Sequence, residues 1–192
     1  MYNLKDRKNH SLLLSKKEVS KLITKLASEI EKLVPQNEEI AIIGIKTRGE
    51  PLSIRIKEIM NKKNPKREIL LGHIDIGEHR DDFRKPKIIP PTRNTKIDFD
   101  IQDKSLFLID DVFNTARTAR AAIDTILEYG RPSRIWLTVL IDRGHRELPF
   151  IPDVTGKNIP TGKNEHIIVK LKEMDGDDSI WLVKDELKKS SS

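Results

Sequence analysis

The sequence predicts an α/β fold in which a mostly parallel central sheet is flanked by helices. Continuous apolar runs at residues 40–45 and 135–141 are typical of strands buried on both faces. Helical spacing of apolar residues precedes the first run and also fills residues 118–129. Strands that alternate with helices indicate parallel pairing. With 192 residues, 36% of them hydrophobic, the chain is expected to form a single domain over residues 1–192.

The first predicted element is an amphipathic helix that begins after Ser15. Ser15 and Glu18 have the spacing of a capping box, in which each side chain can bond the other residue's backbone amide. The helix is expected to end before Pro35, which cannot continue it. Its apolar residues recur at helical spacing, and they are Val19, Leu22, Ile23, Leu26, Ile30 and Leu33.

A strand at residues 40–45 and a helix from Pro51 to about Met60 come next. Residues 46–49, Lys-Thr-Arg-Gly, break the strand, and proline suits the first turn of the helix that follows. A basic loop at residues 61–67 leads to a further predicted strand at 69–76. The charge of this loop fits either a solvated surface or a contact with RNA phosphates.

Residues 77–104 are polar and contain Pro86, Pro90 and Pro91. A segment of this length without secondary structure is usually functional or disordered. A strand at 106–109 and the helix at 118–129 follow, and Gly130 stands where a helix C-terminus is expected. The remaining predicted strands are 135–141, 167–171 and 180–183.

Composition excludes several classes of site. There is no cysteine, so disulfides, thiolate metal sites and cysteine nucleophiles are absent. No apolar run is long enough to span a membrane and the N-terminus has no signal-peptide pattern, so a soluble cytoplasmic protein is expected. The formal charge of +6 permits an anionic partner but does not require one.

Two adjacent carboxylates, Asp110 and Asp111, follow the strand at 106–109. In an open parallel sheet, ligands bind beyond the carboxyl ends of strands. The helix start that comes next can attract a phosphate, with hydroxyls from Thr115 and Thr118 and a cation from Arg117. A pentose 5′-phosphate fits this layout, with its hydroxyls on the aspartates. The alternative is that the two aspartates only cap the turn.

Residues 106–118, LFLIDDVFNTART, resemble the phosphoribosyl-pyrophosphate (PRPP) signature of type I phosphoribosyltransferases. More specifically, the chain resembles the PyrR family, which are uracil phosphoribosyltransferases that also regulate pyrimidine-gene transcription by binding RNA, and the matches span roughly residues 40–175. The matching segments are Gly44 to Gly49 (GIKTRG), Arg80 to Phe83 (RDDF), residues 130–132 (GRP), residues 140–149 (LIDRGHRELP) and residues 156–161 (GKNIPT).

The resemblance implies a type I phosphoribosyltransferase fold with a small hood, a flexible loop at about 77–104 and a disordered tail at about 187–192. The implied reaction joins uracil to PRPP and releases UMP and pyrophosphate, with Mg²⁺ bound through substrate oxygens and water rather than by direct protein ligands. The implied partners are PRPP, uracil, UMP and pyrimidine-operon leader RNA. Relatives imply a homodimer or homotetramer.

The same resemblance assigns roles to individual residues. Asp110 and Asp111 would hold the ribose hydroxyls, and Arg80 would close over the substrate with the mobile loop. The residues expected to act in catalysis are Asp110, Asp111, Arg48 and Arg80. Those expected to bind substrate are Thr47 and Arg48 at the pyrophosphate, Asp110, Asp111, Val112, Phe113, Asn114, Thr115, Ala116, Arg117 and Thr118 at the ribose phosphate, and Ile141, Asp142 and Arg143 at the base.

The chain departs from the family pattern in the phosphate turn and in the flexible loop. Ala116 stands where the family has glycine, and an alanine with positive φ is strained by roughly 1 kcal/mol or more. Asn114 replaces a common tyrosine, and residues 77–79 replace Thr-Leu-Tyr. Two alternative functions therefore stay open: an RNA-binding regulator that senses nucleotide with little turnover, and a phosphoribosyltransferase for another base.

Overall fold

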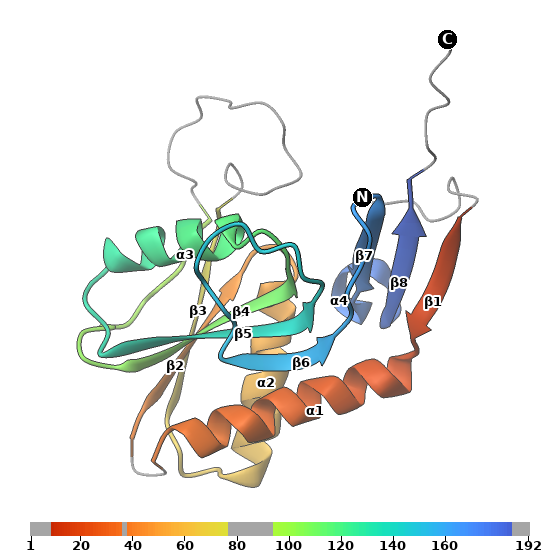
Figure 1. Ribbon diagram of the computed structural model, residues 1–192. Helices are drawn as coiled ribbons and strands as arrows, with labels where there is room; N and C mark the ends of the chain where they lie inside the picture. The colour runs from red at the N-terminus through yellow and green to blue at the C-terminus, as the bar shows by residue number, and fades with distance from the viewer. Residues whose placement is uncertain (1–8, 36–37, 77–93, 186–192) are drawn as a thin grey trace.

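The computed structural model describes residues 9–35, 38–76 and 94–185, and they form two sheets (Figure 1). A five-stranded sheet has the order β3-β2-β4-β5-β6, and a three-stranded sheet has the order β1-β8-β7. The strands of the first sheet are β2 (Ile40–Ile45), β3 (Ile69–Ile74), β4 (Ser105–Phe113), β5 (Arg134–Asp142) and β6 (Val154–Asn158). Those of the second are β1 (His10–Leu14), β7 (Glu165–Lys170) and β8 (Ser179–Lys184).

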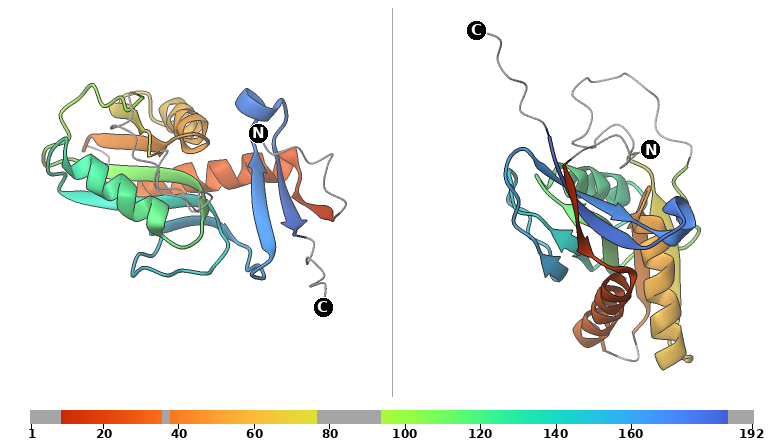
Figure 2. Two further views of the ribbon diagram at one scale, coloured as in Figure 1. Left: turned by 90° about the horizontal axis from the view of Figure 1, so that it is seen from above. Right: turned by 90° about the vertical axis from the view of Figure 1, so that its right-hand side faces the viewer.

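The five-stranded sheet is parallel throughout, which confirms the predicted fold class. Helices α1 (Lys16–Leu33) and α2 (Gly49–Lys63) pack on one face, and α3 (Arg117–Leu127) packs on the other (Figure 2). Each face of the sheet has its own apolar core, and β2 contributes side chains to both cores. Ile40 and Ile42 belong to the core under α1 and α2, whereas Ala41, Ile43 and Ile45 belong to the core under α3.

The chain leaves β2 and β4 in opposite directions along the sheet. From β2 it passes through α2 to β3 on one side, and from β4 it passes through α3 to β5 on the other side. Because β2 and β4 are neighbours, the turns that follow them diverge at one point of the sheet edge. Ligands of open α/β sheets bind at such points.

The small sheet β1-β8-β7 is antiparallel and stands beside the core as the hood (Figure 1). The late strands predicted at 167–171 and 180–183 belong to this hood and not to the parallel sheet. β1 and β6 were not predicted, because each is only five residues long; the apolar run of β1 is limited to Leu12–Leu14, and β6 is mostly polar. The hood carries a one-turn helix, α4 (Lys172–Asp175), between β7 and β8.

Several element boundaries differ from the predictions. β4 continues through Asp110 and Asp111 to Phe113 because it keeps pairing with β5 as far as Asp142, so the prediction that this strand ends at residue 109 was wrong. α2 begins at Gly49, with Pro51 in its first turn, and runs three residues beyond Met60.

Part of the long segment predicted at 77–104 lies on the core. Lys96 forms an antiparallel bridge with His73, and Ile101 is fully buried. Residues 77–93 and the predicted tail at 187–192 lie outside the described residues. Among the helices that the structure describes, none has the length and apolar character needed to cross a membrane.

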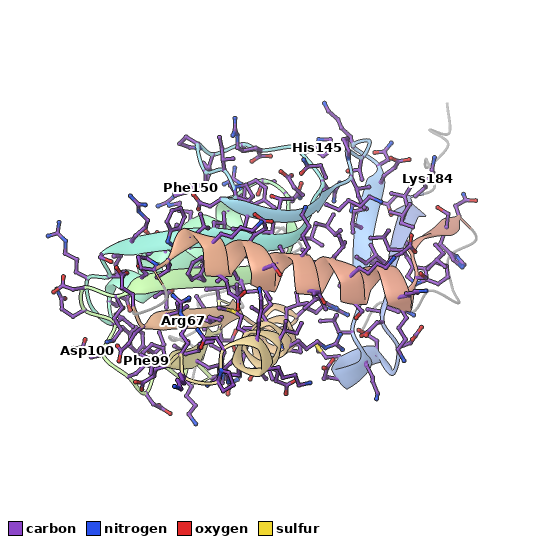
Figure 3. All side chains as sticks on the ribbon, turned by 90° about the horizontal axis from the view of Figure 1, so that it is seen from below. Arg67, Phe99, Asp100, His145, Phe150 and Lys184 are labelled. Carbon is purple, nitrogen blue, oxygen red and sulfur yellow. The ribbon has the colours of Figure 1, made fainter. Side chains whose placement is uncertain are left out.

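Both ends of α1 are fixed by polar contacts. The predicted capping box is present, with the Ser15 amide donating to Glu18 Oε2 at 2.8 Å. At the other end, Arg67 Nη2 donates to the carbonyls of Val34 and Pro35 at 3.3 and 2.8 Å. Figure 3 shows Arg67 beside this end of the helix. Arg67 is 7% exposed and is a structural part of the basic loop, which leaves Lys62, Lys63 and Lys66 as its surface charges.

Candidate functional site

Three turns meet at the carboxyl edge of the parallel sheet, after β2, β4 and β5. The first lies directly on β4, because a Cβ added to Gly49 would be 3.5 Å from the Cα of Asp110. The third is hydrogen-bonded to the end of β4, where the Arg143 amide donates to the Phe113 carbonyl at 3.1 Å. The fold therefore brings the predicted residues 47–48, 110–118 and 141–143 to one place. Arg80 lies outside the described residues.

The turn after β2, residues 46–49, is packed so closely that two glycines are required. A Cβ on Gly44 would lie 2.5 Å from the Gly49 carbonyl oxygen, and a Cβ on Gly49 would collide with the Ile109 carbonyl. The peptide bond between Lys46 and Thr47 is cis. α2 starts immediately afterwards, so its free backbone amides and the positive end of its dipole face this edge of the sheet.

The side chain of Arg48 points to the hood. Its Nη2 donates to both carboxylate oxygens of Asp175 in α4, at 3.2 and 3.3 Å. Both side chains are mostly buried, at 21% and 12% exposure. Arg48 Nε is buried without a hydrogen-bond partner in the described part of the chain. A buried donor without a partner is unfavourable, so the contact with Asp175 holds the Arg48 side chain in this position against a cost.

Asp110 and Asp111 are each 8% exposed. The Asp111 amide donates to Asp110 Oδ1 at 2.9 Å, so Asp110 is oriented by the backbone of its neighbour. Across residues 9–35, 38–76 and 94–185, no hydrogen bond reaches the Asp111 carboxylate, and its oxygens are not among the fully buried atoms. A carboxylate this close to burial is costly without partners, unless a ligand supplies donors or a cation.

The turn after β4 carries the residue that departs from the family pattern. Ala116 has φ +75° and ψ 3°, which is the left-handed conformation that normally favours glycine. It is 2% exposed and directly precedes α3, whose amide at Arg120 donates to the Ala116 carbonyl at 3.0 Å. The turn therefore keeps the backbone shape of a glycine turn. The steric strain expected for an alanine with positive φ is present.

Residues 115–118 place backbone amides at the start of α3, and the Arg117 amide among them donates to Thr115 Oγ1 at 3.3 Å. The Thr115 carbonyl accepts from the amides of Glu147 and Leu148 at 3.1 and 3.2 Å, so the segment after β5 holds this turn in place. The Arg117 side chain turns outward to Glu147, with Nη2 2.7 Å from Oε2. Both groups of this ion pair are more than half exposed, so the contact is weak and Arg117 is not committed to it.

The turn after β5 is joined to the hood by Arg143. Its Nε donates to Thr161 Oγ1 at 3.0 Å and its Nη2 to the Glu165 carbonyl at 2.5 Å. Arg143 is 8% exposed and Ile141 is fully buried, so any ligand contact of Ile141 has to come from its backbone. His145 Nε2 lies 2.6 Å from the Thr161 carbonyl oxygen, so its ring makes a structural hydrogen bond in the same turn.

Mg²⁺ prefers hard oxygen ligands and keeps several waters. The described residues contain no group of three or more His, Asp or Glu side chains that could hold a metal by themselves. The nearly buried Asp111 carboxylate has no hydrogen-bond partner within the described ranges, and its oxygens are the hard ligands that Mg²⁺ prefers. The edge of the sheet therefore suits a cation that arrives with its substrate.

A second arginine, Arg55 in α2, also holds the hood, although no sequence motif marks it. Arg55 donates to Glu173 and to Asp178, with Nη2 2.8 Å from Asp178 Oδ1. The hydrogen bonds to Glu173 raise the pKa of Arg55, and the same bonds lower the pKa of Glu173. Burial acts to raise the pKa of Asp178, but bonds from Arg55 and the Lys172 amide outweigh it and lower that pKa. The only sequence signal for this contact is the acidic run at 173–178.

The phosphoribosyl transferase domain family matches residues 11–173 of the chain. The bifunctional protein PyrR of Thermus aquaticus is 44% identical over 170 residues, which cover 88% of this chain and 93% of that protein. The bifunctional protein PyrR of Clostridioides difficile strain 630 is 44% identical over 171 residues, or 88% and 96% of the two chains.

Solved structures agree with the fold. A hypoxanthine-guanine phosphoribosyltransferase of Bacillus anthracis superposes with a TM-score of 0.68 over 92% of this chain and 99% of its own, at 18% identity. The hypoxanthine phosphoribosyltransferase of Trypanosoma cruzi gives 0.68 over 92% and 97%, at 16% identity. The solved structures show only the fold, whereas the sequence matches show the family. The chain belongs to the PyrR family of phosphoribosyltransferases.

Proposed function

We propose that this protein transfers a phosphoribosyl group from PRPP to uracil, forming UMP and pyrophosphate, and that it also regulates pyrimidine genes by binding RNA in response to UMP. Membership of the PyrR family supports both activities. The observation that carries the catalytic part is the Asp111 carboxylate, which is 8% exposed, has no hydrogen-bond partner in the described chain, and lies at the end of β4 shortly before the start of α3.

Asp110 and Asp111 accept hydrogen bonds from the ribose hydroxyls in this proposal. Carboxylates are suited to this because they offer acceptors only, and they stabilise positive charge as it develops on the ribose when the bond to pyrophosphate breaks. The amide of Asp111 holds Asp110 in place, so this part of the acceptor set is ordered before the ligand arrives.

The start of α3 holds the 5′-phosphate. Residues 114–118 supply backbone amides, the hydroxyls of Thr115 and Thr118, and the cation of Arg117, whose ion pair with Glu147 is exposed and easily exchanged. Ala116 keeps the left-handed conformation, so the amides are presented as a glycine would present them. This favours a working phosphate site over the alternative of a regulator with little turnover.

The turn after β2 holds the pyrophosphate. Thr47 and Arg48 directly precede Gly49, which packs against Ile109 and Asp110 and starts α2 with its free amides. Mg²⁺ bound with PRPP would neutralise charge on the leaving pyrophosphate. Asp142 and Arg143 read the base at the end of β5, and Arg80 closes over the substrate. No covalent nucleophile is required.

Formation of UMP from labelled uracil, PRPP and MgCl₂ tests the catalytic proposal. We expect Asp111→Asn to lower kcat/KM about 100-fold, because an amide keeps the shape but loses the charge that stabilises the transition state. Asp124→Asn is the matched control, since Asp124 is an exposed residue of α3 that pairs only with Arg120 among the described residues. Absence of UMP from the wild-type protein, or product from hypoxanthine instead, would contradict the assignment.

A gel shift with pyrimidine-operon leader RNA tests the regulatory proposal. We expect retention of the RNA to increase with UMP and to fall steeply with salt, because lysine contacts to phosphates release counterions. Retention that does not change with UMP would contradict a UMP-responsive regulator. Sedimentation of the same samples tests the proposed homodimer or homotetramer.

A further inference from the structure

Two arginines, one just before α2 and one within it, hold the hood against this helix. Arg48 is the residue before α2 and contacts Asp175, and Arg55 contacts Glu173 and Asp178 two turns further on. All three acids lie in or next to α4, between the two long hood strands. The two arginines differ in what else they can do, because Arg55 lies within α2 whereas Arg48 belongs to the turn at the sheet edge.

Asp175 is itself fixed in place. Its Oδ2 accepts from the Leu171 amide at 3.0 Å, and its own amide donates to the Leu171 carbonyl at 2.7 Å. The carboxylate is therefore tied to the start of α4 on one side and to Arg48 Nη2 on the other. At 12% exposure it is screened from water, which strengthens its attraction for the guanidinium.

This contact restricts Arg48 without using all of its donors. A free arginine side chain has many rotamers, and ordering it costs about 2 kcal/mol when a ligand has to do so. Here Nη2 is held by Asp175 and Nε is fully buried. Nη1 makes no hydrogen bond within the described part of the chain and is not among the fully buried atoms, so it is the donor that an anion can reach. The guanidinium is thus ordered before any anion binds, with donor capacity to spare.

We infer that Asp175 is a positioning residue, which holds the Arg48 guanidinium in the orientation that receives the pyrophosphate group of the substrate. The inference rests on the proposed function for the identity of the ligand. It assigns a role in substrate binding to the hood, because α4 carries the carboxylate that sets the geometry of the turn after β2. Arg48 touches the ligand and Asp175 acts through it.

Calorimetric titration of the full-length protein with inorganic pyrophosphate in MgCl₂ tests this directly. We expect Asp175→Ala to raise the Kd for pyrophosphate and the KM for PRPP about tenfold, with a smaller change in kcat, since it removes the orientation and not the chemistry. Asp175→Asn keeps an acceptor oxygen and should give an intermediate Kd. The control is Asp178→Ala, which removes a neighbouring hood contact that does not touch Arg48. It should lower Tm and leave the Kd within about twofold.

A double-mutant cycle with Arg48→Ala separates positioning from general damage to the hood. If Asp175 acts through Arg48, Asp175→Ala adds no further loss of pyrophosphate affinity in the Arg48→Ala background. Unchanged or tighter binding in Asp175→Ala, equal losses in Asp178→Ala, or no pyrophosphate binding by the wild type would each overturn the inference. Binding that depends on Asp175 in a protein that forms no UMP would support it while contradicting the catalytic proposal.

Discussion

The turns after β2 and β4 lie side by side at the sheet edge, and each presents backbone amides at the start of a helix. They differ in what restricts their sequence. The turn after β2 is limited by space, since Gly44 and Gly49 each leave no room for a Cβ. The turn after β4 is limited by conformation, since Ala116 adopts φ +75° although it carries a Cβ. A glycine required by contact cannot be replaced, whereas a glycine favoured by conformation can be, at a cost of about 1–2 kcal/mol. This explains how the chain can differ from its family at residue 116 and keep the fold.

Gly49→Ala should break the turn after β2 and give the largest effect. The added methyl would collide with the Ile109 carbonyl of a buried strand, so we expect a loss of about 3 kcal/mol in the free energy of unfolding. Urea unfolding measures it. Gly144→Ala is the matched control, because Gly144 has φ +79° and open space around it, so only the conformational cost of about 1 kcal/mol is expected. Equal losses in the two variants would contradict the distinction between space and conformation.

The helix after the first turn is also held from outside, by Arg55. Arg55→Met should lower the free energy of unfolding by about 2 kcal/mol at pH 7, because Asp178 is left nearly buried without its cation. Asp178 and Glu173 have lowered pKa values in the folded protein, so their contribution is present above about pH 4 and is lost as pH falls through the folded values. The gap between wild type and variant should therefore shrink from pH 6 to pH 3.

Arg120→Met is the control for that measurement. Arg120 lies on α3, after the second turn, and its ion pair with Asp124 is exposed. We expect a change below about 0.5 kcal/mol at pH 7. A gap for Arg55→Met that stays constant or widens toward low pH would show that the Arg55 contacts do not stabilise the hood as described.

Ala116→Gly should relieve the backbone strain in the turn after β4. We expect the free energy of unfolding to rise by about 1 kcal/mol, because glycine adopts positive φ without a steric penalty. The matched change Ala121→Gly, in the right-handed interior of α3, should have the opposite sign and a similar size. A loss of stability in Ala116→Gly would mean that the buried methyl packs better than the turn is strained.

The strands and helices of the core could be predicted because their residues carry a local signal. The continuous apolar run of β2 and the spacing after Ser15 are examples. β6 gave no such signal, since Val154 and Gly156 point inward in a strand that is otherwise polar. Nor could the sequence show which sheet β7 and β8 join, because an apolar strand fits an antiparallel hood as well as a parallel core.

The residues of the candidate site likewise fall into those that a local sequence pattern reveals and those that only the folded structure reveals. Asp110, Asp111 and the start of α3 are consecutive in the chain and carry a recognisable pattern. The partner of Arg48 is Asp175, which lies far away in the sequence and becomes a neighbour only through the packing of the hood. The conformation of Ala116 is set by the turn that surrounds it and not by the alanine, so only coordinates could determine its φ.

The pairing of β1 with β8 has a consequence for how the protein is made. β1 is the first strand of the described chain to leave the ribosome, and its sole partner in the sheets is β8, the last. The strands of the parallel sheet, by contrast, are all complete once Asn158 has been added. During synthesis the sheet that carries Asp110 and Asp111 can therefore assemble first. The hood, and with it Asp175, closes on Arg48 only when the C-terminal strands are released.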